Sequence, residues 1–218
     1  QTVPGYLHLL QRYTRAVRAR NALLKRKPID EAALDSFTAE VIQLGNQLIG
    51  HRHDLLPALA PRIQAAHQRI APGGEELSVE YVPSVKTDFA ADLERIRDRE
   101  RKQCATLIGP HRDELALLLD DRPAAEYASE GQKRTIAIAL KIAQAEHLTE
   151  IHGVPPVLLI DDVMGELDEQ RRQGFLPLLE QCGSGRGQGF MTCTEENWPR
   201  ELGRILQRWQ VNEGIISS

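Results

Sequence analysis

Residues 129–134, with the sequence SEGQKR, combine groups that can begin a helix with groups that can bind a phosphate. Ser129 is a good N-cap residue, and Gln132 lies three positions later, as a capping box requires. The same turn would expose backbone N–H groups at the positive end of a helix, and Gly131 permits close approach of a ligand. The segment therefore allows two interpretations, a structural cap or a phosphate site.

A second stretch, VLLIDD at residues 157–162, ends an apolar run in two adjacent carboxylates, Asp161 and Asp162. Ligands of α/β proteins gather at the carboxyl ends of strands. Mg²⁺ prefers one or two carboxylates together with waters and phosphate oxygens, and a neighbouring acid can orient or deprotonate an attacking water. The alternative is that both acids only cap the following turn.

The bulk composition is that of an ordinary globular protein. The 218 residues, 41% hydrophobic and 27% charged, suffice for one large domain or two small ones. No apolar run could span a bilayer, and the start lacks a signal-peptide pattern. Cys104, Cys182 and Cys193 are widely spaced and indicate neither a disulfide framework nor a metal site. We therefore expect a cytoplasmic protein without membrane contact.

Charge is distributed unevenly along the chain. The net charge of −4 argues against a uniformly basic nucleic-acid binder. Residues 1–29, however, contain no acidic residue and seven basic ones: Arg12, Arg15, Arg18, Arg20, Lys25, Arg26 and Lys27. Such a local basic face could contact phosphate, or it could be a solvated helix surface.

The first third of the chain has the periodicity of paired helices. The heptad-spaced positions are Leu10, Tyr13, Val17 and Leu24, then, after Pro28, Leu34, Phe37, Val41, Leu44, Leu48 and Leu55. We expect Pro57 and Pro61 to interrupt or reset the second helix, and APGGEE at 71–76 to form a turn or linker. These features predict a helical arm over residues 1–76.

The remainder alternates between strand and helix patterns, which predicts a layered α/β domain over residues 77–218. The expected strands cover 77–82, 106–109, 113–119 with a turn at Asp120 and Asp121, 156–161, 190–194 and about 205–212. The expected helices cover 88–104, 130–150, about 168–181 and a short segment near Trp198, with a glycine-rich loop at 183–189. The apolar run at 156–161 is typical of a strand covered on both faces.

The stretches SEGQKR, VLLIDD and GELD, in that order, resemble the C-terminal half of ABC-type ATPase heads. The best match is to the RecF family, whose GPHRD element is similar to residues 109–113, and whose second domain is similar to the arm. ALKIAQAEHL and LDEQRRQGFLPLL extend the likeness over nearly the whole chain. The resemblance implies an α/β C-terminal ATPase lobe with a coiled-coil-like arm. The arm would end at residue 76 or, alternatively, extend to about residue 104.

The resemblance also implies roles for residues of the first stretch. Ser129, Gly131 and Gln132 would form the signature motif that contacts the γ-phosphate of ATP held by an opposing subunit. Lys133 and Arg134 would add positive charge. Glu130 stands where many signature motifs have Gly, which is a departure from the general pattern.

Further roles follow for the second stretch. Asp161 would hold Mg²⁺ as the Walker B acid, and Asp162, in place of the more usual Glu, would polarise the attacking water. Glu166, Leu167 and Asp168 would belong to the D-loop. The switch position would be Thr192 or Thr194.

A phosphate-binding P-loop requires the pattern G-x-x-x-x-G-K-[ST], and this chain contains no Gly-Lys dipeptide. The family's P-loop lobe should therefore precede residue 1 or be a separate chain. We expect this chain alone to bind ATP weakly and to hydrolyse essentially none.

The family resemblance implies a role in DNA replication and repair, including recombination and the SOS response. It implies ATP-dependent homodimerisation on DNA at single-strand/double-strand junctions, and cooperation with RecO and RecR to load RecA. The residues that we assign tentatively to DNA contact are Arg12, Arg15, Arg18, His111 and Arg112.

Three alternatives remain open. The chain could be part of another chromosome-structure or nuclease-associated head, although those usually have a much longer coiled coil, or it could be a non-enzymatic interaction module. GPHR could be a turn with a buried His–carboxylate contact instead of a phosphate site. A triad of His111, Asp113 and Ser129 is disfavoured because no nucleophile-elbow pattern is present.

Overall fold

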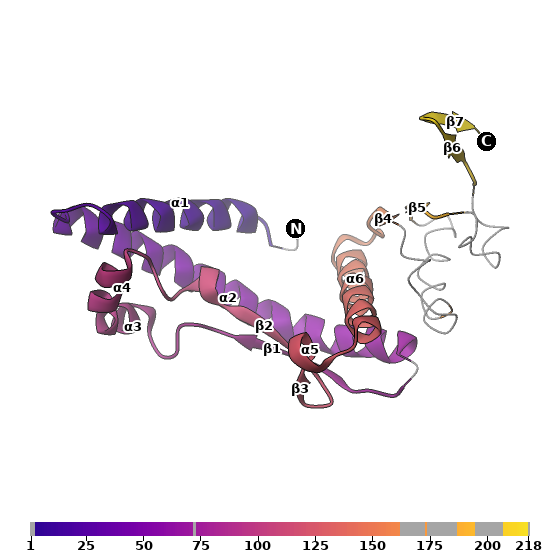
Figure 1. The fold of residues 1–218 in the computed structure, drawn as a ribbon, viewed down its shortest axis with the longest axis horizontal. Helices are drawn as coiled ribbons and strands as arrows, with labels where there is room; N and C mark the ends of the chain where they lie inside the picture. The colour runs from indigo at the N-terminus through magenta and orange to yellow at the C-terminus, as the bar shows by residue number, and fades with distance from the viewer. Residues whose placement is uncertain (1–2, 72, 162–172, 174–186, 195–206, 218) are drawn as a thin grey trace. The chain divides into compact units, whose positions relative to one another are not determined.

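The computed structural model describes residues 3–71, 73–161, 173, 187–194 and 207–217 (Figure 1). The chain divides into two compact units, one comprising Gln1–Ala60 and Val79–Leu118, the other Pro61–Ser78 and Leu119–Ser218. The helices predicted at 168–181 and near Trp198, and most of the glycine-rich loop, lie outside the described residues. The division between arm and lobe at residue 76 remains a prediction.

The first unit begins with two antiparallel helices, α1 (Tyr6–Leu24) and the first part of α2 (Glu31–Ile70). Their direction follows from side-chain contacts, because Tyr6 meets Arg52, Arg20 meets Thr38, and Leu24 packs with Leu34. The heptad positions supply the apolar core, as predicted. Its main cluster consists of Tyr13, Ala16, Val17, Val41, Leu44, Leu48, Phe89 and Leu93.

Helix α2 corrects the prediction about the prolines. It runs without a break through Pro57 and Pro61 to Ile70. Each proline lacks the N–H that would bond the carbonyl four residues earlier. The helix continues because apolar contacts before and after the prolines hold it, with Leu48, Ile63, Ala66 and Ile70 all buried. Tertiary packing thus outweighs the local preference of proline.

The helix predicted at residues 88–104 is two helices, α3 (Phe89–Arg95) and α4 (Arg97–Gln103). The break falls at Ile96, whose φ of −105° and ψ of 8° are not helical. In α4, Glu100 is fully buried and its carboxylate pairs with Arg20 of α1 at 2.6 Å. The second of the two helices thus contributes a buried ion pair with α1.

Residues 106–109, predicted as a strand, are irregular instead. Their backbone groups bond to side chains, not to a neighbouring strand. Thr106 N–H donates to Asn21 Oδ1 at 2.7 Å, and Leu107 N–H donates to Glu100 Oε1 at 2.8 Å. Side-chain acceptors from two helices thus replace the ladder that a strand would require.

A three-stranded sheet has the order β1 (Leu77–Val82), β2 (Glu114–Leu119) and β3 (Arg122–Pro123). Asp120 and Asp121 connect β2 and β3, with φ of 49° and 61°. Two residues of positive φ are what a tight hairpin needs. The turn predicted at these aspartates is therefore confirmed.

The second unit continues with α5 (Ala124–Tyr127) and the long α6 (Glu130–His152), which ends at Gly153 in the left-handed conformation. Two ion pairs join α6 to the last turns of α2, Arg62–Glu150 and Arg69–Glu146, the latter at 2.7 Å. The predicted helix over 130–150 is thus confirmed, with its start within one residue of Ser129.

Two further pairs of strands lie in the second unit. β4 (Leu158–Asp161) pairs in parallel with β5 (Gly189–Thr192), and β6 (Gln210–Asn212) pairs antiparallel with β7 (Ile215–Ser217). β4 is not covered on both faces, since Leu159 is 80% exposed. β7 was not predicted, although Glu213 and Gly214 between apolar residues are a hairpin signal.

Candidate functional site

The helix α6 begins with the capping box predicted at residues 129–134. Ser129 is the N-cap, and its Oγ accepts a hydrogen bond from the Gln132 backbone N–H at 3.2 Å. The Gln132 side chain completes the box, because its Oε1 accepts from the Ser129 backbone N–H at 2.6 Å. The structural interpretation of this turn is therefore confirmed.

The cap leaves the turn accessible to a ligand. Ser129 and Glu130 are both exposed, and Gly131 is half-buried. The cap uses the Ser129 oxygen as an acceptor and does not use its hydroxyl proton, so Ser129 can also donate. Glu130 pairs with Lys133 at 3.2 Å, and Arg134 is exposed. A cap and a phosphate contact are thus compatible at the same residues.

Gln132 also ties this turn to the segment between α2 and β1. Its Nε2 donates to Glu75 Oε1 at 2.7 Å. The next residue, Glu76, is fixed by Asp120, which accepts from the Glu76 N–H and donates its own N–H to the Glu76 carbonyl, both at 2.9 Å. Glu75 is a contact that sequence reasoning missed, because APGGEE signals only a turn.

The carboxyl ends of β4 and β5 bring two of the predicted site residues together. Asp161 is directly opposite Thr192 in the parallel register. Thr192 Oγ1 donates a hydrogen bond to Asp161 Oδ1 at 2.5 Å. Both residues are exposed, and Thr194 is exposed two residues past the end of β5. Asp161, predicted as the metal-binding acid, and Thr192, one of the two predicted switch residues, therefore lie side by side.

Asp162, Glu166 and Asp168 lie outside the described residues. Within the residues that the structure describes, no group of three or more His, Cys, Asp or Glu side chains could hold a metal ion. A cation at Asp161 would depend on water and phosphate oxygens for its other ligands, as Mg²⁺ commonly does. The donor set at β4 therefore suits Mg²⁺ bound with a nucleotide.

The GPHRD element packs against the arm helices. Gly109 has φ of 121°, and a Cβ there would lie 2.5 Å from the Tyr13 hydroxyl and 2.7 Å from Phe89 Cζ. Only glycine fits such a close approach. Pro110 is buried at the start of a short 3-10 helix (Pro110–Arg112), and its carbonyl accepts from Arg52 at 2.6 Å.

His111 uses both ring nitrogens within the protein. Nδ1 lies 2.7 Å from the Tyr13 hydroxyl, and Nε2 lies 3.2 Å from the Thr106 carbonyl. Because a carbonyl can only accept, Nε2 carries the proton and Nδ1 accepts from Tyr13. Desolvation lowers the pKa of His111, although part of the residue stays exposed, and burial raises the pKa of Tyr13. The ring of His111 thus bonds Tyr13 and a backbone carbonyl. The buried His–carboxylate contact expected if GPHR were only a turn is not among these bonds.

Asp113 is the buried carboxylate of this element. It accepts from Tyr81, from the backbone N–H and hydroxyl of Ser84 at 2.8 and 2.9 Å, and from Arg52 at 3.3 Å. Desolvation and the neighbouring Asp113 raise the pKa of Tyr81 to about 12. This network, which sequence reasoning missed, joins Asp113 to α2, to β1 and to the segment that follows β1.

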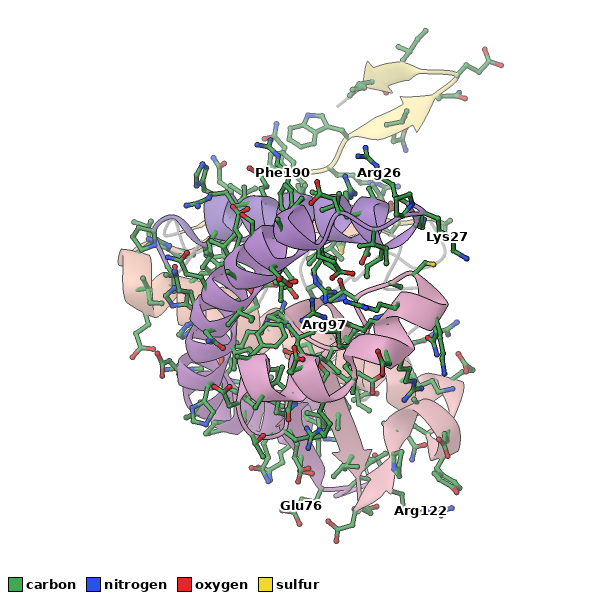
Figure 2. All side chains as sticks on the ribbon, turned by 90° about the vertical axis from the view of Figure 1, so that its left-hand side faces the viewer. Arg26, Lys27, Glu76, Arg97, Arg122 and Phe190 are labelled. Atoms are coloured by element: carbon green, nitrogen blue, oxygen red, sulfur yellow. The ribbon has the colours of Figure 1, made fainter. Side chains whose placement is uncertain are left out.

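The basic residues of the arm separate into two kinds. Arg20 is buried and belongs to the core, where its guanidinium reaches Glu100, Thr106 and Thr38. It is therefore not part of a phosphate-binding face. The others are exposed: Arg12, which lies 3.9 Å from Glu40, and Arg15, Arg18, Lys25, Arg26 and Lys27. Figure 2 shows Arg26 and Lys27 reaching outward near the end of α1.

Arg112, the last of the predicted DNA contacts, is also exposed.

None of the helices that the structure describes is long and apolar enough to cross a membrane. Cys104 and Cys193 are free thiols, while Cys182 lies outside the described residues.

No family model matches the chain. Curated relatives do: the DNA replication and repair protein RecF of Symbiobacterium thermophilum is 37% identical over an alignment of 214 residues, and the match covers 90% of this chain. RecF of a Cyanothece species is 38% identical over 230 residues and 99% of this chain. The chain belongs to the RecF family. It spans 56% and 58% of the length of these two relatives.

The fold agrees with this assignment. A solved structure of the recombination mediator protein RecF with ATP, in the RecFOR pathway, matches 99% of this chain with a TM-score of 0.80 and 27% identity. The match covers 58% of that RecF chain. The predicted fold class, an ABC-type α/β lobe with long arm helices, is thereby confirmed.

Proposed function

We propose that this chain supplies the signature and Walker B surfaces of a RecF-type ATPase, whose P-loop lobe comes from the rest of the protein. The complete protein would bind ATP between two copies and dimerise on DNA at single-strand gaps. It would act in the cytoplasm with RecO and RecR to load RecA. The exposed capping box at Ser129 is the observation that carries this proposal.

The signature turn supports the proposed ATP contact because it gathers hydrogen-bond donors at the start of α6. The first N–H groups of α6 have no carbonyl within the helix to bond, and the helix dipole favours an anion there. The Ser129 hydroxyl can add a donor, and Lys133 and Arg134 add charge within two turns. An incoming γ-phosphate from the partner's nucleotide would find these groups already ordered by the cap.

The strand ends support the metal part of the proposal. Asp161 would hold Mg²⁺, which would neutralise phosphate charge when it is bound with ATP. Asp162 would orient the attacking water, while Glu166 and Asp168 would cross the dimer interface. Between the two candidates for the switch position, the contact with Asp161 favours Thr192 over Thr194.

The exposed apolar pair Leu159 and Phe190 supports the need for a further lobe. These residues are opposite each other in β4 and β5 and are 80% and 52% exposed. Among the residues that the structure describes, β4 and β5 form a two-stranded parallel sheet, and such a sheet with an open apolar face is not stable alone. We expect the isolated chain to hydrolyse essentially no ATP, and a separate P-loop lobe to restore hydrolysis on mixing.

Substitution of Ser129 tests the nucleotide role separately from the cap. In the full-length protein, Ser129→Asp keeps an N-cap acceptor but places a negative charge where the phosphate would bind. We expect ATP-dependent dimerisation, measured by analytical ultracentrifugation, to be lost in Ser129→Asp, with the melting temperature of the monomer unchanged.

Ser129→Asn is the matched control, because it caps as well and adds no charge. It should dimerise with an affinity reduced by no more than about tenfold, about 1.4 kcal/mol. Dimerisation of Ser129→Asp at the wild-type ATP concentration would refute the proposed phosphate contact.

A further inference from the structure

Thr192 makes a contact that the family resemblance does not assign to it. It is the last residue of β5 and lies opposite Asp161, the last residue of β4. Its hydroxyl donates to Asp161 Oδ1 at 2.5 Å, a short bond of the kind made to an ionised carboxylate. The acceptor is the same carboxylate that would hold Mg²⁺.

This hydrogen bond gives the two oxygens of the Asp161 carboxylate different roles. A carboxylate offers about four lone-pair sites, two on each oxygen. Thr192 fixes Oδ1, so the orientation of the whole group is set and Oδ2 stays available for a metal ion or its bound water. Donors that orient a metal-binding carboxylate in this way commonly control metal affinity.

The location argues against a purely structural bond. Both residues are exposed at the carboxyl end of the strands, where solvent competes for the same groups and a hydrogen bond adds little stability. The carboxyl end of a parallel sheet is where ligands of α/β proteins bind. The hydrogen bond therefore contributes more to ligand binding than to the stability of the fold.

We propose that Thr192 is the positioning residue of Asp161: it holds the carboxylate in the orientation that binds the nucleotide's Mg²⁺, and does not itself contact the γ-phosphate. This inference rests on the proposed function of Asp161.

The test uses the full-length protein with ATP and a Mg²⁺ titration of dimerisation. Thr192→Val is nearly isosteric and replaces the hydroxyl by a methyl group, while Thr192→Ser keeps the hydroxyl. We expect Thr192→Val to raise the half-saturating Mg²⁺ concentration about tenfold, and Thr192→Ser to stay within about twofold of wild type. Mn²⁺ binding, followed by electron paramagnetic resonance with ATP present, should weaken in parallel. Thr149→Val, in which the lost hydroxyl bonds only the Ala145 carbonyl within α6, is the matched control and should titrate like wild type.

Unfolding temperatures accompany each variant, and Thr192→Ala repeats the test if Thr192→Val does not fold. A wild-type Mg²⁺ titration in both Thr192→Val and Thr192→Ala would overturn the inference, as would an equal loss in Thr192→Ser. An equal shift in Thr149→Val would also overturn it, because the effect would then not be specific to the Asp161 contact.

Asp161→Asn separates this inference from the proposed function. If Asp161→Asn leaves the Mg²⁺ titration unchanged, Asp161 is not a metal ligand and the proposed site is wrong. If Asp161→Asn shifts the titration and Thr192→Val does not, only the role of Thr192 is wrong.

Discussion

Several side chains in this protein make more than one hydrogen bond or ion pair, and the buried pair Arg20–Glu100 is the clearest case. Arg20 is 3% exposed and Glu100 is fully buried. Between them they also bond Thr38, Thr106 and the backbone of Leu107. Charges removed from water to this extent are tolerated only when each has its full set of partners.

Replacing Arg20 by Met should lower the free energy of unfolding by about 3–5 kcal/mol, because it leaves Glu100 buried without a counter-charge. The double variant Arg20→Met/Glu100→Met removes both charges. In urea denaturation of the four-member cycle we expect a coupling energy of at least about 1 kcal/mol. Additive effects of the two substitutions would contradict this interpretation of the pair.

The residues at the signature turn show what a sequence can predict at this scale. Ser129 and Gln132 are three apart, and their capping box depends on local geometry alone, so the spacing was sufficient. Glu75 lies 57 positions from Gln132. Contacts of this kind, and the Asp113 network, depend on tertiary packing that no local pattern contains.

At the scale of elements, helix positions were predicted better than helix ends. The heptad spacing located α1 and α2 because burial of one face determines which residues must be apolar. Pro57 and Pro61 misled the prediction, since proline weakens a helix locally but the packed face of α2 extends past both. The break at Ile96 was also missed, because no proline or glycine in the local sequence marks it.

A buried histidine in the last turns of α2 should make stability depend on pH. His67, near the end of α2, is fully buried, and neither ring nitrogen has a hydrogen-bond partner among the described residues. Burial lowers the pKa of His67 below 6.5, opposed only in part by the carboxylates of Glu75 and Asp120. The folded state therefore holds His67 neutral, while the unfolded state takes up a proton below about pH 6.5.

Stability should fall as the pH drops below about 6.5, by up to about 1.4 kcal/mol per pH unit for this one proton. Thermal unfolding of His67→Leu between pH 5 and 8 should show a shallower decline than wild type. His53 is exposed and offers the control, since His53→Gln should leave the slope unchanged. An unaltered slope in His67→Leu would show that other groups cause the acid sensitivity.

The whole molecule combines an overall negative charge with a basic arm surface. Arg15 and Arg18 are exposed on α1, about 4.5 Å apart along the helix axis. Contacts of such side chains with DNA phosphates would add affinity without base recognition. The exclusion of Arg20 from this surface could not be predicted from composition, because a buried and an exposed arginine look alike in a sequence.

For the full-length protein with ATP, we expect DNA affinity to fall steeply with salt. The double variant Arg15→Gln/Arg18→Gln should reduce the slope of log K against log salt by about 2. Arg62→Gln, which removes a cation that is paired with Glu150, is the control. Affinity measured by fluorescence anisotropy that is insensitive to salt, or a slope unchanged in the double variant, would argue against a role of the arm in DNA binding.

Leu159 and Phe190, paired across β4 and β5, also bear on how the polypeptide should be prepared. An uncovered pair of large apolar side chains on short strands favours self-association in concentrated solution. Light scattering of the 218-residue chain should accordingly rise with protein concentration. Polar substitutions at both positions, Leu159→Gln and Phe190→Gln, should lower this self-association.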